Sequence, residues 1–249
     1  MTEALLNNER CFLEQDAWKE VMRSVIVEDA LISDRSDIVI ELMVLKSNIP
    51  GFFVDITNII LSESYPNYAH INQTACKIHQ LRVDLFKWHS SYEFLLSCAP
   101  KIRPGSAEYD RRCKVFATYL SCVIITSRLL GAISPTERVE LEEVTQILAG
   151  QMLDLELEVK STSSAACLFM AQTLGVAQAT IATSEDWLRE EYEDFGQGVG
   201  KLESVSPEGF VSPTGLSSAS GSSGVPEQRD LIEVWKFVKW NKLCGRKMS

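Results

Sequence analysis

The chain of 249 residues lacks the short motifs that mark most enzymes. It contains no G-x-G-x-x-G or G-x-x-x-x-G-K-[ST] loop for a nucleotide phosphate and no G-x-S-x-G turn for a nucleophilic serine. It also lacks the D-D-x-x-D motif with which helical terpene synthases hold magnesium and diphosphate. The acidic run at residues 190–194 has a different spacing and is interpreted as a solvated helix end. We therefore expect no enzyme activity and no cofactor.

The spacings typical of metal sites and disulfide frameworks are absent as well. His70, His79 and His89 lie nine and ten residues apart, which scatters them around one helix instead of placing two on one face. The cysteines are odd in number, and no two share a C-x-x-C spacing. The pattern favours small core residues in a reducing compartment. The seven cysteines stand at positions 11, 76, 98, 113, 122, 167 and 244.

Basic residues are fewer than acidic ones, 24 against 34, and the net charge of −10 argues against nucleic-acid binding by the whole molecule. The N-terminus shows no basic start followed by an apolar run, so no secretory signal is expected. The longest apolar segment, residues 115–133, is interrupted by Arg128 and several hydroxyl side chains. This composition favours a buried helix of a soluble protein over a membrane span.

What the sequence does have is helical periodicity along most of its length. Clean period-two alternation is absent, so an all-α, multi-helix domain with long antiparallel helices is predicted. Ser134, Pro135 and Glu137 form a helix start signal, and a break is expected at residues 48–51. The apolar stripe after that start comprises Leu141, Val144, Leu148, Met152, Leu155 and Val159. Helices are predicted over residues 9–32, 36–47, 52–62, 68–98, 109–131, 135–160 and 164–189.

A change in composition divides the chain into three regions. Residues 1–195 form the predicted helical domain. Residues 196–226 are rich in glycine, serine and proline, gain too little from burial to offset the entropy of ordering, and are predicted to be a flexible loop. Residues 227–249 regain helical spacing, and a final helix is expected to pack back on the domain because it carries Trp235 and Trp240.

Arg128 is the single most informative candidate residue. A guanidinium within an apolar helix needs an anion or several carbonyl groups, because an unpaired buried charge is very costly. We favour an ion pair with a glutamate of the next helix, such as Glu140 or Glu143. The alternative is a ligand carboxylate, held in a cavity near Arg128.

The C-terminal tail carries basic residues among aromatic ones. A nuclear-import or nucleic-acid patch is one interpretation of this pattern. A docking helix whose lysines face water explains the same residues with fewer assumptions and is preferred. The basic residues are Lys236, Lys239, Lys242, Arg246 and Lys247, and the aromatic ones are Trp235, Phe237 and Trp240.

Several helical segments resemble the fungal-specific transcription-factor domain of zinc-cluster regulators. The resemblance is clearest over residues 110–190 and 225–247 and weaker over 34–100. Segments that carry it are Ala117-Thr118-Tyr119-Leu120, Ser127-Arg128-Leu129-Leu130-Gly131-Ala132, Val139-Glu140-Leu141-Glu142, Ala166-Cys167-Leu168-Phe169-Met170-Ala171-Gln172, Val176-Ala177-Gln178-Ala179-Thr180, Glu185-Asp186-Trp187, Val225-Pro226, Trp235-Lys236-Phe237, Trp240 and Leu243-Cys244-Gly245-Arg246-Lys247.

This resemblance implies a nuclear, or partly cytoplasmic, regulator that acts through protein contacts. Members of the family carry an N-terminal two-zinc, six-cysteine finger and a basic linker, and this sequence has neither. We therefore expect no sequence-specific DNA binding from the chain alone, no membrane association, and a partner that is a full-length zinc-cluster regulator or a second copy. By analogy, it would control a metabolic or secondary-metabolite gene cluster. The rival hypotheses are a helical enzyme or small-ligand binder and a finger encoded upstream of Met1.

Overall fold

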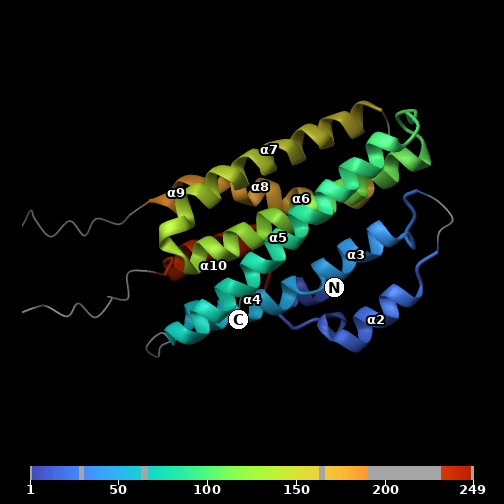
Figure 1. The fold of residues 1–249 in the computed structure, drawn as a ribbon. Coiled ribbons are helices and arrows are strands. Elements are labelled where there is room, and N and C mark those ends of the chain that lie inside the picture. Colours follow the sequence, from blue (N-terminus) through green and yellow to red (C-terminus); the bar gives the residue numbers. More distant parts are fainter. Residues whose placement is uncertain (1, 28–30, 63–66, 163–165, 190–230, 248–249) are drawn as a thin grey trace, which may run out of the picture.

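The computed structural model describes residues 2–27, 31–62, 67–162, 166–189 and 231–247, without the side chains of 166–169. Every element in these ranges is a helix, which confirms the all-α prediction (Figure 1). The α-helices are α1 (Thr2–Asn7), α2 (Asp16–Ser24), α3 (Asp37–Lys46), α4 (Ile49–Leu61), α5 (Tyr68–Cys98), α6 (Ala107–Ile133), α7 (Arg138–Ser161), α8 (Ala166–Ala182), α9 (Ser184–Leu188) and α10 (Val234–Leu243), with 3₁₀ turns η1 (Phe12–Glu14) and η2 (Pro135–Glu137).

Helix α6 is the centre of the domain and contacts α3, α4, α5, α7 and α8. Every residue from 117 to 133 is buried, because this apolar helix is covered on all sides by other helices. Among the described residues, α6 is the one helix long and apolar enough to cross a membrane. However, 94% of its most apolar window is buried inside the fold. Its composition is thus explained by its place in the core.

The long helices α5, α6, α7 and α8 run alternately up and down beside one another (Figure 1). Helix α5 has the bounds that the sequence predicted, residues 68–98. The predicted helix over residues 164–189 is two helices, α8 and α9, separated by Thr183. The short α9 places Trp187 over the end of α6, with the indole nitrogen of Trp187 3.7 Å from where a Cβ on Gly131 would lie.

The start of α7 differs in detail from the predicted helix start signal. The Ser134 side chain makes no hydrogen bond to a backbone N–H; its hydroxyl instead donates to a carboxylate oxygen of Glu137 at 2.8 Å. The same Glu137 oxygen lies 3.2 Å from His79 Nε2 on α5. Because Glu137 faces α5, residues 135–137 form a 3₁₀ turn and α7 begins one turn later, at Arg138.

Two predictions about the N-terminal region need correction. The predicted break at residues 48–51 is shorter, because α4 already begins at Ile49 and takes Pro50 into its first turn, where proline needs no N–H partner. Gly51 lies inside this helix, and a Cβ there would come within 2.3 Å of a Glu14 carboxylate oxygen. Within the described part of residues 9–32, the predicted helix is reduced to η1 and the nine residues of α2.

The C-terminal helix α10 packs back on the domain against α8 and α9. Trp240 is fully buried, whereas Trp235 remains 39% exposed. The Ile232 amide donates to the Ala132 carbonyl at 2.9 Å, which joins this segment to the end of α6. The predicted flexible loop at residues 196–226 lies outside the described residues.

Candidate functional site

Arg128 lies in the interior of the domain, where α6, α7 and the end of α8 meet. One Nη atom of Arg128 donates to a Glu142 carboxylate oxygen at 2.6 Å and to the Thr180 carbonyl at 2.8 Å. The other Nη atom donates to the Thr183 hydroxyl at 3.2 Å. The side chains of Arg128 and Glu142 are 0% and 2% exposed, so this ion pair is closed to solvent.

Burial opposes the charges of both partners in this ion pair. Burial lowers the pKa of Arg128 to about 10, although the neighbouring Glu142 carboxylate raises it in part. Burial likewise raises the pKa of Glu142 above its ordinary value, opposed by the charge of Arg128 and by hydrogen bonds. One such hydrogen bond comes from the Gln146 amide, at 2.6 Å from a Glu142 oxygen. The guanidinium is thus a cation held by one carboxylate and by the end of α8.

Two tryptophans complete the surroundings of Arg128. Its guanidinium carbon lies 4.3 Å from the ring centre of Trp187 and 5.8 Å from that of Trp240. A cation over an aromatic face gains electrostatic energy, and more so where water is excluded. The Nε of Arg128 and the second oxygen of Glu142 have no hydrogen-bond partner among the described residues.

The partner of Arg128 is on the helix that the sequence indicated, but it is Glu142 and neither Glu140 nor Glu143. Both of those glutamates are exposed. The buried face of α7 is formed by Leu141, Glu142, Thr145, Ala149, Met152 and Val159, whereas Val144, Leu148 and Leu155 of the predicted stripe are only partly buried. The predicted stripe followed apolar residues alone, and therefore missed the polar residues on the true inner face.

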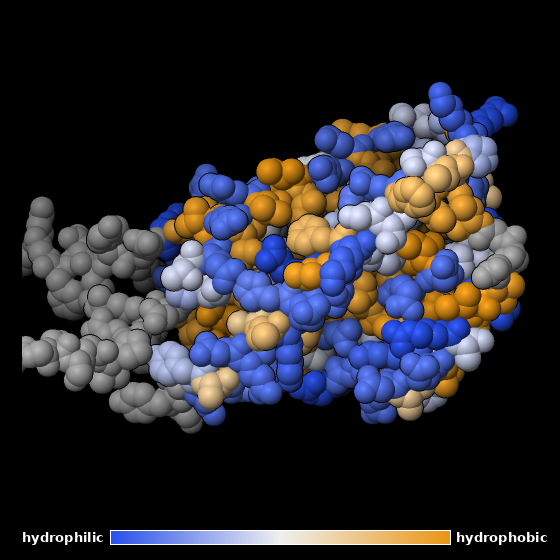
Figure 2. Space-filling model, viewed as in Figure 1, coloured by the Kyte–Doolittle hydropathy of each residue, from blue (hydrophilic) through white to orange (hydrophobic). Residues whose placement is uncertain are grey.

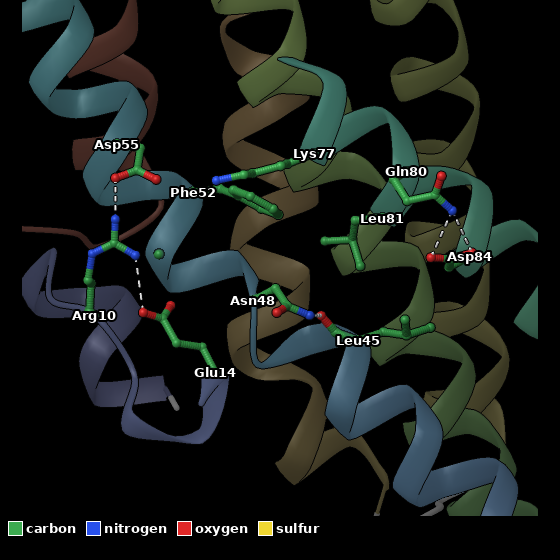
Figure 3. Close-up of a pocket in the computed structure, with 11 residues that line it drawn as sticks. Arg10, Glu14, Leu45, Asn48, Phe52, Asp55, Lys77, Gln80, Leu81 and Asp84 are labelled. Atoms are coloured by element: carbon green, nitrogen blue, oxygen red, sulfur yellow. Dashed lines mark hydrogen bonds and ion pairs between the residues drawn. The ribbon is translucent and has the colours of Figure 1, made fainter. Parts of the chain in front are cut away.

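The largest cavity described here is open and about 480 Å³ in volume, between the N-terminal segment, α4 and α5 (Figure 3). Its charges already neutralise one another: Arg10 bonds to Glu14 at 3.1 Å and also to Asp55. Asp84 accepts two hydrogen bonds from Gln80, at 3.0 and 3.1 Å. Such a mixed, solvent-open surface concentrates neither sign of charge. No motif in the sequence points to the residues that line this cavity.

A second cavity, of about 20 Å³, is more enclosed and lies where α1, α3, α6, α8 and the C-terminal turn meet. Lys46 and Arg246 are its charged lining residues. In the sequence Arg246 stands out only as part of the basic tail, because the residues that form the cavity wall lie far apart in the chain. Arg128 lines neither of these two cavities.

The basic tail is less exposed than the sequence suggested. Lys236 is 4% exposed, and its Nζ lies 2.9 Å from a carboxylate oxygen of Glu233. The expectation that the tail's lysines face water is therefore wrong for Lys236. Arg246 is also buried, at 7% exposed. Lys239 is partly exposed and pairs with Asp186 at 2.5 Å. These contacts use much of the tail's charge to hold α10 against the domain.

The three histidines lie on α5, as their spacing indicated. His79 pairs with Glu137, and the His89 ring stacks on Tyr119 at 4.4 Å between ring centres. Within the described part of the chain, no group of three His, Cys, Asp or Glu side chains could hold a metal ion. Six cysteines have described side chains and all are free thiols, with Cys11, Cys113 and Cys122 buried. The acidic run at residues 190–194 lies outside the described residues.

Comparison of the chain with protein-family models, with curated proteins and with solved structures finds no match.

Proposed function

We propose that the chain is a transcription-regulator-like helical domain that works through protein contacts and not through chemistry of its own. The observation that carries this proposal is the exposed apolar side of α2. Two basic side chains of this helix contact the domain: Lys19 donates to Asn48 at 3.0 Å, and Arg23 donates to Glu41 at 2.9 Å. No residue of α2 is buried.

The apolar side of α2 faces solvent. Trp18, Val21 and Val25 recur at steps of three and four and are 43%, 50% and 39% exposed. Phe12, 57% exposed, makes an edge-to-face contact with Trp18 at 5.3 Å. We name these four residues the α2 stripe. A contiguous exposed apolar patch of this kind is typical of a protein-interaction surface. On the face of the molecule in Figure 2, hydrophobic residues lie in small groups among hydrophilic ones.

The charge of the chain favours a basic partner for this surface. At a net charge of −10, two copies of the chain repel each other at long range, whereas a positively charged protein is attracted. A full-length zinc-cluster regulator carries a basic linker and DNA-binding finger, which supports it over a second copy as the partner. On this proposal the chain is nuclear and reaches its target genes, including those of a metabolic gene cluster, through that partner.

The rival hypothesis, a ligand-binding cavity at Arg128, has less support. The guanidinium is already neutralised by Glu142 and covered by Trp187. A substrate carboxylate would have to displace a buried carboxylate that lies 2.6 Å away. We therefore interpret this ion pair as part of the framework that joins α6, α7 and α8.

A reporter assay tests the proposal. The full chain is fused to a heterologous DNA-binding domain and expressed in a fungal host, and reporter output and nuclear fluorescence of a tagged copy are measured. Trp18→Glu combined with Val21→Glu should reduce reporter output at least fivefold. The matched control is Leu157→Glu, which charges a single residue that is 64% exposed on α7 and should leave output unchanged.

The outcome against the proposal is equally specific. Equal reporter output from the α2-stripe variant and the Leu157→Glu control would remove this surface as the contact. Sequence-selective binding of duplex DNA by the purified chain, resistant to salt, would contradict the indirect mode of action. Sedimentation of the purified wild type as a dimer that the α2-stripe variant abolishes would replace the heterologous partner with a second copy.

A further inference from the structure

The turn after α10 places an arginine in the interior of the domain. Gly245 has a φ of +79°, and the amides of Gly245 and Arg246 donate to the carbonyls of Lys242 and Asn241, at 2.9 and 3.0 Å. This pattern is a Schellman motif, in which glycine takes the left-handed position that ends the helix. The next amide, of Lys247, donates to the Leu6 carbonyl at 2.8 Å and so fixes the turn against α1.

The Arg246 side chain is buried without a carboxylate. Its guanidinium carbon lies 3.4 Å from the ring centre of Phe53, and one Nη donates to Asn241 Oδ1 at 2.7 Å. No salt bridge to Arg246 occurs among the described residues. A guanidinium has five N–H donors, so one such hydrogen bond leaves most of its capacity unused. Burial lowers the pKa of Arg246 to about 10, and the side chain therefore remains cationic at neutral pH.

A second cation lines the same enclosed cavity. Lys46, at the last turn of α3, makes no hydrogen bond or ion pair with a described residue, and its charge lowers the pKa of the Cys122 thiol against the effect of burial. Ser121 of α6, which is 8% exposed, also lines the cavity and has no hydrogen-bond partner within the described part of the chain. The lining includes no aspartate or glutamate.

We propose that this cavity, lined by Lys46, Arg246 and Ser121, is a binding site for a small monovalent anion. Two cations line this cavity without a carboxylate, and one of them, Arg246, is buried, so an anion bound there would offset charge that the wall leaves unbalanced. The volume of about 20 Å³ admits a group of about the size of one water molecule, such as a halide or one oxygen of a small carboxylate. The site is independent of the proposed function and of the α2 stripe.

The contrast with the larger cavity supports this assignment. There Arg10 is flanked by Glu14 and Asp55, so the wall supplies its own counter-charge. In the enclosed cavity, the polar side chains of the lining include the hydroxyls of Ser121 and Thr173, the Gln172 amide and the Cys122 thiol, whose pKa burial raises to about 11. The Cys244 thiol lines the cavity as well. Burial raises the pKa of that thiol, so it stays protonated at neutral pH and is no counter-ion.

Thermal unfolding of the full chain tests the site. Melting temperatures are measured in sodium bromide and in sodium formate from 0 to 100 mM, with sodium gluconate, whose anion is too large for the cavity, holding the ionic strength constant. A ligand at ten to a hundred times its dissociation constant should raise the wild-type midpoint by about 3 to 8 °C, with saturation. Arg246→Met and Lys46→Met should each remove most of this rise.

Matched controls separate the site from general salt effects. Arg111→Met and Lys87→Met remove exposed cations, 48% and 70% exposed in their side chains, and should retain the full rise. If Arg246→Met does not fold, Ser121→Val replaces it, because this change removes the hydroxyl and narrows the cavity. Crystals of the wild type grown in bromide give a readout without any variant, since anomalous scattering locates the ion.

The bromide and formate experiments distinguish a general anion site, a carboxylate site and no site. Bromide density between Lys46 and Arg246, with a rise that both variants lose, supports a site for small anions in general. A rise in formate that both variants lose, without one in bromide, assigns the site to a carboxylate and also supports the proposal. Bromide found on the surface only, combined with equal shifts in wild type, variants and controls, would overturn it.

Discussion

Two buried arginines lie near the same ring, Trp240, and differ in what balances their charge. The guanidinium carbons of Arg128 and Arg246 lie 5.8 and 5.4 Å from the centre of that ring. Arg128 has a carboxylate partner in Glu142, two further acceptors at the end of α8, and Trp187 above it. Arg246 has an amide oxygen and the face of Phe53.

The difference shows that an aromatic face does not replace an anion. Burial lowers the pKa of both arginines to about 10, and at Arg128 the Glu142 carboxylate opposes this effect. At Arg128 the protein supplies the counter-charge, and the group joins three helices. At Arg246 no described residue does so, and the group lines a cavity together with a second cation. The first arginine belongs to the framework, and the second is available to a ligand.

Removing the paired arginine is the strongest test of this comparison. Arg128→Ala leaves Glu142 buried without its cation and should lower the free energy of unfolding by about 3–5 kcal/mol. Chemical denaturation without added ligand measures the change, and Arg111→Ala serves as an exposed-arginine control. An unchanged or raised stability would instead identify Arg128 as a residue that awaits an anionic ligand.

Removing both members of the pair should cost less than removing one. The double variant Arg128→Met, Glu142→Leu leaves no unpaired charge, and we expect it to lie within about 2 kcal/mol of wild type. Arg128→Met and Glu142→Leu alone should each be less stable than the double variant. A double-mutant cycle by denaturation measures the coupling. Additive losses would show that the pair contributes through packing alone.

The burial of the cavity that Arg246 lines can be tested by pH, because the Cys122 thiol lines the same cavity. Burial raises the pKa of this thiol to about 11 from an ordinary value of 9.0. As the pH rises through this window the unfolded chain loses the proton first, so the thiol makes the folded state less stable with increasing pH. By pH 10 the contribution is about 1 kcal/mol.

Cys122→Ala should therefore lose about 1 kcal/mol less stability than wild type between pH 7 and pH 10, as measured by denaturation at each pH. Cys76→Ala removes an exposed thiol and is the matched control, with the pH dependence of wild type. Parallel curves for Cys122→Ala and wild type would mean that the thiol is not shielded from water in solution.

The smallest expected effect is the removal of the unpaired arginine. Arg246→Met in the absence of small anions keeps an apolar side chain on Phe53 and removes a buried cation that has no carboxylate partner, so the stability should change by less than about 1 kcal/mol. Denaturation in gluconate measures this value. A loss as large as that of Arg128→Ala would reveal a counter-charge for Arg246 within the chain and would cancel the difference between the two arginines.

Much of the secondary structure could be predicted from local sequence. Helix α5 has its predicted bounds, and α6 was identified as a buried helix, because both signals lie within one segment. The errors occurred where a side chain makes its main contact with another part of the fold. Glu137 turns to His79 and delays α7, and Glu14 packs against Gly51 where a break was expected. Glu142 was missed because polar residues were assigned to the outer face.

The sequence by itself determined the helical class, the buried character of α6 and the need of Arg128 for a partner, since each follows from periodicity or from the cost of an unpaired charge. Only the tertiary structure decided which glutamate forms the ion pair with Arg128. It also decided that the α2 stripe faces solvent and that Lys46 and Arg246 line the same cavity. These outcomes depend on the rotation of each helix about its axis and on contacts between residues up to 200 positions apart in the chain, which no local pattern encodes.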